Sequence, residues 1–213
     1  MGVRTGFLLV AGLEQTQIVE RLRMRLGEVV HEPDTDAPDQ VPALGPVLDG
    51  WTLIVDQPLQ LLLDETALSR LSRSTTLVTL VVNETVMYSD ATGYEDGRER
   101  WWVASGGEQR DWRLAWPRPE VAWWRRLLGE PPGPSRLQIR GDPPANLPEL
   151  LDTAIRHEAA ELGRHGEPVD YQFDIPGAVV AAATGGAFAG WPLDEAWTFR
   201  ALLSGAGNAA TTM

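Results

Sequence analysis

The chain has 213 residues, of which 43% are hydrophobic and 23% charged, with a formal net charge of −12 at pH 7. These values are typical of a folded globular protein with a sizeable core. It contains no cysteine. It also contains no lysine, so all 18 residues of the Lys and Arg count are arginine. This excludes thiol nucleophiles, disulfides, Schiff-base lysines and P-loop lysines.

The first 73 residues predict two strand–helix pairs separated by a loop. The apolar run at 6–13 is too short for a membrane span and lacks a signal-peptide cleavage site, so we expect a buried strand and a cytoplasmic protein. The other predicted elements are a helix over 14–26 capped by Gly27, an acidic proline-rich loop over 31–50, a strand at 51–56 and a helix over 61–73.

Residues 75–118 predict a β-meander, with a hairpin at the stretch TGYEDGRERWW (92–102). Asp96-Gly97 is typical of a two-residue type I′ turn, in which both central residues have positive φ. A regular ladder from that turn places Gly93 opposite Arg100. Trp101 and Trp102 then project from opposite faces of their strand, because side chains alternate.

The C-terminal half predicts more helix than strand. Its expected elements are a helix over 119–129, a short strand at 136–140, an amphipathic helix over 147–166, a strand over 169–176, a short apolar helix over 177–186 and a tail from 202 that has no periodicity. We therefore expect an α+β fold, an antiparallel β-meander with helices packed on it. It forms a single domain over 1–213, or two lobes with a proline-rich boundary near 130–148.

Tryptophan and arginine supply the candidate binding residues. The chain has nine tryptophans, and two arginines directly follow an adjacent tryptophan pair. Tryptophan and arginine are enriched at the energetic centres of protein interfaces, although core packing is the ordinary role of most tryptophans. The candidates for partner binding are Trp101, Trp123, Trp124, Arg125 and Arg126.

A metal site is the alternative. His157, Glu161 and His165 follow at intervals of four along the predicted helix 147–166, so they share one helix face. Histidine and carboxylate side chains are ligands for zinc or iron. The spacing is not that of the HExxH motif, because Glu161 occupies the position of the second histidine. A solvated helix face explains the same residues, and the sequence requires no cofactor.

Two stretches resemble a pattern in uncharacterised bacterial proteins: VVNETVMYSDATGYEDGRERWWV (81–103) and GEPVDYQFDIPGAVVAAATG (166–185). The pattern has a DGR-x-W hairpin and a later VDY-x-FD-x-P motif. The resemblance implies an α+β fold and carries no assigned activity or catalytic residue.

Charge and composition favour a non-enzymatic protein-binding module, for example an immunity-type inhibitor of a basic partner. Eight acids and no arginine lie in 31–66, and ten acids against three arginines lie in 141–213. Such acids attract a basic protein and repel nucleic acid and anionic membranes. The competing hypothesis is a metal-dependent hydrolase that uses the histidine helix. The sequence leaves the oligomeric state open.

Overall fold

The structure is a computed structural model that describes residues 4–30, 41–106, 137–165, 171–188 and 197–204. Its strands are β1 (Arg4–Ala11), β2 (Met24–Val30), β3 (Ala43–Leu48), β4 (Trp51–Val55), β5 (Thr76–Asn83), β6 (Tyr88–Glu95), β7 (Arg98–Gly106), β8 (Gln138–Gly141) and β9 (Phe199–Ser204). Its helices are α1 (Gln15–Leu22), α2 (Glu65–Leu71), α4 (Leu147–His165), α5 (Ile175–Ala183) and the short 3-10 helices η1 (Glu84–Val86) and η2 (Tyr171–Asp174).

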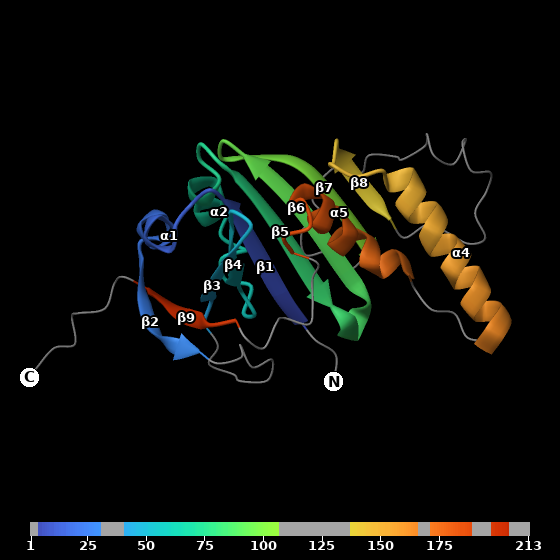
Figure 1. The fold of residues 1–213 in the computed structure, drawn as a ribbon, viewed down its shortest axis with the longest axis horizontal. Helices are drawn as coiled ribbons and strands as arrows, with labels where there is room; N and C mark the ends of the chain where they lie inside the picture. The colour runs from blue at the N-terminus through green and yellow to red at the C-terminus, as the bar shows by residue number, and fades with distance from the viewer. Residues whose placement is uncertain (1–3, 31–40, 107–136, 166–170, 189–196, 205–213) are drawn as a thin grey trace, which may run out of the picture. The chain divides into compact units, whose positions relative to one another are not determined.

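The nine strands form one antiparallel sheet in the order β2-β9-β3-β4-β1-β5-β6-β7-β8, with β2 and β8 as its edges (Figure 1). Strands β5 to β8 follow one another in chain order, as a meander does. The expected α+β class and antiparallel sheet are therefore confirmed. At the other end the order is not sequential, because the C-terminal β9 lies between β2 and β3.

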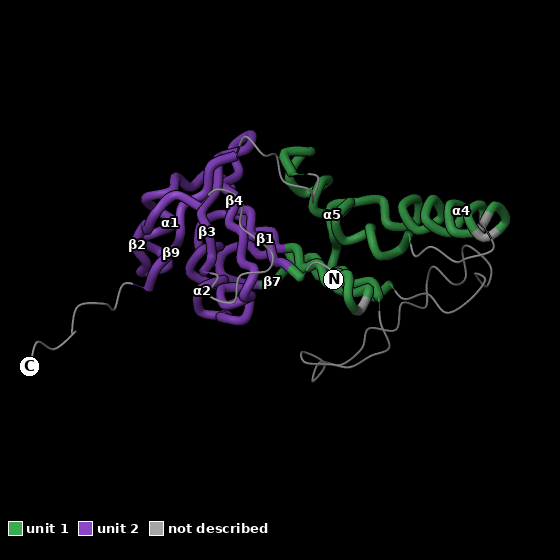
Figure 2. Tube along the Cα trace, turned by 90° about the horizontal axis from the view of Figure 1, so that it is seen from below, with its two compact units in different colours: residues 1–4, 80–93, 99–190 green, residues 5–79, 94–98, 191–213 purple. Residues whose placement is uncertain are grey.

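Contacts divide the chain into two compact units, which Figure 2 shows in different colours. Unit 1 comprises residues 1–4, 80–93 and 99–190, and unit 2 comprises 5–79, 94–98 and 191–213. Residues 137–148, at the predicted proline-rich boundary, lie within unit 1.

The core of unit 2 is built on β1, whose residues Phe7 to Val10 are completely buried. β1 pairs with β4 in a regular antiparallel register in which Leu9 lies opposite Leu53. A run of consecutive apolar residues is expected for a strand that is covered on both faces. The prediction of a buried first strand is therefore confirmed.

Thr5 in β1 is a polar exception in this core. Its side chain is 0% exposed, and its Oγ1 has no hydrogen-bond partner among the residues that the structure describes. We expect Thr5→Val to raise the free energy of unfolding by about 1 kcal/mol, because an isosteric methyl group removes the desolvation cost of the hydroxyl. Thr52→Val is the matched control: Thr52 is equally buried, but its Oγ1 donates to the Leu13 carbonyl at 2.6 Å. The control should lower the same free energy by about 1 to 2 kcal/mol, and urea denaturation of both variants checks the sign.

In unit 1, η2 is held by contacts from two other elements. The Ser89 hydroxyl on β6 donates to the Phe173 carbonyl at 2.5 Å. The Glu158 carboxylate on α4 accepts from the backbone N–H of Gln172 at 3.2 Å and from its Nε2 at 3.4 Å. These contacts fix the stretch that was predicted as a strand over 169–176. That prediction is wrong for Tyr171–Asp174, which form a 3-10 helix leading directly into α5.

Three other sequence predictions differ from the structure. The first helix ends at Leu22, because Arg23 adopts the left-handed conformation (φ 57°) and Met24–Val30 form the edge strand β2. The predicted loop 31–50 contains β3 from Ala43 onwards, and residues 31–40 lie outside the described part. The predicted tail begins too early, since Phe199–Ser204 pair with β2 as β9. The strand at 111–118 and the helix at 119–129 lie outside the described residues.

The predicted hairpin turn is confirmed, because Asp96 and Gly97 both have positive φ (50° and 78°). The predicted register beyond it is wrong. A Cβ on Gly93 would lie 2.2 Å from the Trp101 ring, so Gly93 and Trp101 share a face of the sheet. A regular ladder with Gly93 opposite Arg100 would separate them, since facing residues share a face and neighbours alternate. The contact fits a register shifted by one residue between the turn and Trp101, as a β-bulge produces.

Candidate functional site

Only one of the five predicted binding residues lies in the described part. Trp101 is buried (8% exposed) and packs against Gly93, so in this structure it is a core residue. Trp123, Trp124, Arg125 and Arg126 lie outside the described residues. The neighbouring Trp102 is half-buried and projects from the opposite face of β7.

Trp102 lies opposite Arg140 in the antiparallel pair of β7 and β8. Figure 1 shows these two strands side by side. The Arg140 guanidinium lies over the Trp102 ring, 5.5 Å from its centroid, which is the geometry of a cation–π contact. The close approach of the two strands depends on Gly141, opposite Trp101. Its φ is +73°, and a Cβ there would lie 2.1 Å from the Arg100 carbonyl oxygen.

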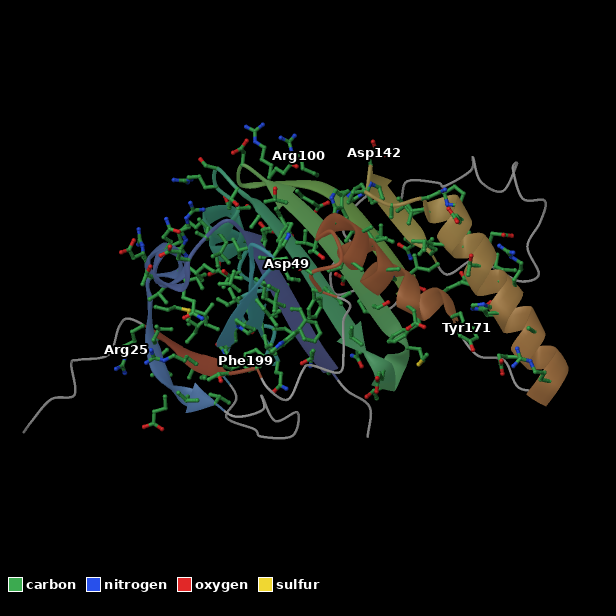
Figure 3. The ribbon with its side chains drawn as sticks, in the orientation of Figure 1. Arg25, Asp49, Arg100, Asp142, Tyr171 and Phe199 are labelled. Carbon is green, nitrogen blue, oxygen red and sulfur yellow. The ribbon has the colours of Figure 1, made fainter. Side chains whose placement is uncertain are left out.

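Glu99 completes this cluster. Its carboxylate forms an ion pair with the Arg140 guanidinium, and the two side chains are 35% and 36% exposed. We call Glu99, Trp102 and Arg140 the Trp102 cluster. Arg100 and Asp142 lie at the same end of β7 and β8 beside it (Figure 3). The Arg140 guanidinium thus contacts both a ring and a carboxylate.

The Trp102 cluster has the chemistry of a recognition surface. It offers a large aromatic face and a planar fork of donors, both partly open to solvent. Preorganised aromatic and arginine side chains lose little conformational entropy on binding, which is why they dominate the energetics of protein interfaces.

The histidine helix is found where it was predicted, but two of its side chains already have neighbours. His157 contacts Tyr171 edge to face, with ring centroids 5.3 Å apart. Glu161 pairs with Arg164 at 2.8 Å. The side chain of His165 is not described. Among the described residues no group of three or more histidine or acidic side chains is placed to hold a metal ion. The hydrolase hypothesis stays a prediction, which one equivalent of bound metal, lost in His157→Ala, would support.

Several acidic residues that were predicted to steer a basic partner have structural roles. Asp64 begins α2, where its Oδ1 accepts from the backbone N–H groups of Thr66 and Ala67. Glu158 holds Gln172.

Asp56 is a completely buried acid of unit 2. It is 0% exposed, and its carboxylate accepts backbone N–H groups from Gln60 at 3.0 Å, Leu61 at 2.8 Å and Leu62 at 2.9 Å. Burial raises the pKa of this carboxyl above its ordinary value of 3.8, and the three backbone hydrogen bonds oppose that rise. The side chain organises the connection between β4 and α2.

No protein-family model, curated protein or solved structure matches this chain. The resemblance to uncharacterised bacterial proteins accordingly stays a prediction. Within the described residues, none of the helices combines the length and the apolar composition that a membrane crossing requires.

Proposed function

We propose that this chain is a non-enzymatic protein-binding module that contacts its partner through the Trp102 cluster. The observation that carries the proposal is the half-buried Trp102 ring, held against Arg140 by the pairing of β7 with β8 and by Glu99. The proposal keeps the predicted combination of tryptophan and arginine as binding residues, but the tryptophan that contacts the partner is Trp102 rather than Trp101.

The partner that we propose is a basic protein, and the form of module is an immunity-type inhibitor. The net charge of −12 supports this, because long-range attraction accelerates the encounter with a basic protein. Aromatic and arginine contacts at the Trp102 cluster then provide short-range affinity, since desolvated anchors of these types carry most of the free energy of an interface.

The test is the native mass of the untagged protein purified from its own host. We expect the mass of the chain plus that of a basic protein. The same purification of a Trp102→Ala/Arg140→Ala variant should yield the chain alone. A matched variant with exposed arginines changed elsewhere, Arg156→Ala/Arg164→Ala on α4, should keep the partner.

A chain that carries one equivalent of metal and no protein partner would contradict the proposal and favour the hydrolase. If the Trp102→Ala/Arg140→Ala variant retained the partner, the proposal that the Trp102 cluster contacts the partner would be wrong. Thermal unfolding of each variant separates loss of binding from loss of folding.

A further inference from the structure

The C-terminal end of α2 gathers positive charge in a chain that is acidic overall. Nη1 of Arg21, on α1, donates to the backbone carbonyls of Leu71 at 2.9 Å and Arg73 at 2.7 Å, with a longer contact to that of Arg70 at 3.5 Å. These carbonyls form the negative end of the helix dipole, so one guanidinium satisfies them. Of the other arginines here, Arg70 donates its Nε to the carbonyl of Thr66 within α2 at 3.2 Å.

The tip of the β6–β7 hairpin docks at the same place. The Gly97 N–H donates to the Ser72 carbonyl at 3.3 Å, and the Ser74 N–H donates to Oδ1 of Asp96 at 3.1 Å. Arg98 follows Gly97 and Arg73 follows Ser72 in the sequence. The hydrogen bond between Gly97 and Ser72 therefore brings the two arginines close together. All of these residues belong to unit 2.

We call Arg21, Arg70, Arg73 and Arg98 the arginine collar. No ion pair joins any of the four to a carboxylate within the described parts of the chain. Arg73 and Arg98 are exposed. Counting the flanking Arg23 together with the acids Glu20, Glu95, Asp96 and Glu99, the neighbourhood has five positive and four negative charges, a local sum of +1 against −12 for the chain.

Such a cluster has an energetic cost, because like charges repel and the hydrogen bonds of Ser72 and Ser74 with the hairpin tip hold the chain segments that carry these arginines close together. Its field extends only locally, since salt screens charges beyond about 8 Å at physiological ionic strength. A short ligand with closely spaced carboxylates gains the attraction of the collar without meeting the acidic remainder of the chain. Arginine forks match carboxylates in a bidentate geometry.

We infer that the arginine collar is a docking surface for an acidic polypeptide segment. The inference uses none of the three residues of the Trp102 cluster, so it does not depend on the proposed function. Nucleic acid is the less suitable polyanion, because its long charged backbone extends beyond the collar onto the acidic remainder of the chain.

The experiment is fluorescence anisotropy of a labelled decaglutamate peptide titrated with the full chain at about 20 mM and about 150 mM salt. The collar variant is Arg73→Glu/Arg98→Glu, which changes the two exposed arginines and spares the Arg21 cap. The control is Arg4→Glu/Arg156→Glu, which changes the net charge equally at exposed positions in unit 1. Circular dichroism verifies the fold of both variants.

We expect saturable binding to the wild type that is weakened at least about tenfold by the collar substitutions and no more than about twofold by the control. Equal weakening in the two variants would show a general charge effect and overturn the inference, as would the absence of saturable binding at low salt. A single-stranded oligonucleotide of ten phosphates that binds more tightly than the peptide would overturn the choice of polypeptide.

Discussion

Asp56→Ala should lower the free energy of unfolding by about 3 to 5 kcal/mol, because it leaves three backbone N–H groups without an acceptor in a buried turn. The carboxylate accepts from Gln60, Leu61 and Leu62, and the side chain is 0% exposed. Urea denaturation monitored by tryptophan fluorescence measures the loss. Asp64→Ala is the matched control, since Asp64 also accepts two backbone N–H groups but is exposed, and it should cost about 1 kcal/mol.

The same residue predicts an unusual pH dependence. Burial raises the pKa of Asp56 in the folded chain above the ordinary 3.8. In the pH window above 3.8, the folded state therefore binds a proton that the unfolded chain has already released. The stabilisation of the folded state by this bound proton is fully present below pH 3.8 and is lost as the pH rises through the pKa that Asp56 has in the folded chain. The difference in unfolding free energy between wild type and Asp56→Ala should widen as the pH falls through this window. If the difference narrows, the hydrogen bonds outweigh burial and the pKa is depressed instead.

Trp102→Ala should weaken binding of the co-purified partner by about 2 to 3 kcal/mol, or roughly 30- to 150-fold in the dissociation constant. The substitution removes the ring that supports Arg140 and opens the anchor to water. Isothermal titration calorimetry with the purified partner measures the change.

The control for Trp102→Ala is Trp51→Phe, which changes a half-buried tryptophan on β4 in unit 2. It should leave the affinity unchanged within about twofold, because it lies outside the proposed interface. Equal affinities of Trp102→Ala and the wild type would place the interface elsewhere on the molecule. Glu99→Gln, which breaks the ion pair with Arg140, should weaken partner binding less than Trp102→Ala does, since the ion pair is partly exposed to solvent.

Elements governed by local sequence were predictable. The Asp96-Gly97 dipeptide defines its own turn, the apolar run of β1 marks a buried strand, and the apolar spacing of α4 marks a long helix. In each case the determining residues are neighbours in the chain, so propensity and periodicity suffice.

Elements governed by distant pairing were not predictable. Leu26 fits helical spacing, yet it lies on β2 opposite Leu202 of β9, far away in sequence. Neither strand identifies the other, and the left-handed Arg23 that ends α1 is not a typical helix terminator. Tertiary pairing therefore overrides the local pattern.

The candidate site shows both cases. Tryptophan and arginine were the expected residue types, and opposite faces for Trp101 and Trp102 follow from alternation. Which tryptophan is accessible depends on the packing of Trp101 against Gly93, which the sequence pattern did not reveal. The role of Arg140 depends on the register of β8 with β7, which joins residues almost forty positions apart.

The most direct test of the binding-module account is site-specific photo-crosslinking in the native host. A benzoylphenylalanine residue in place of Arg100, an exposed residue two positions from Trp102 on β7, should capture one protein, and the same probe in place of Arg156 on α4 should not. Capture of a basic protein at position 100 alone is the predicted result. Capture at neither position, or equally at both, would contradict the claim that this chain binds a protein partner through β7 and β8.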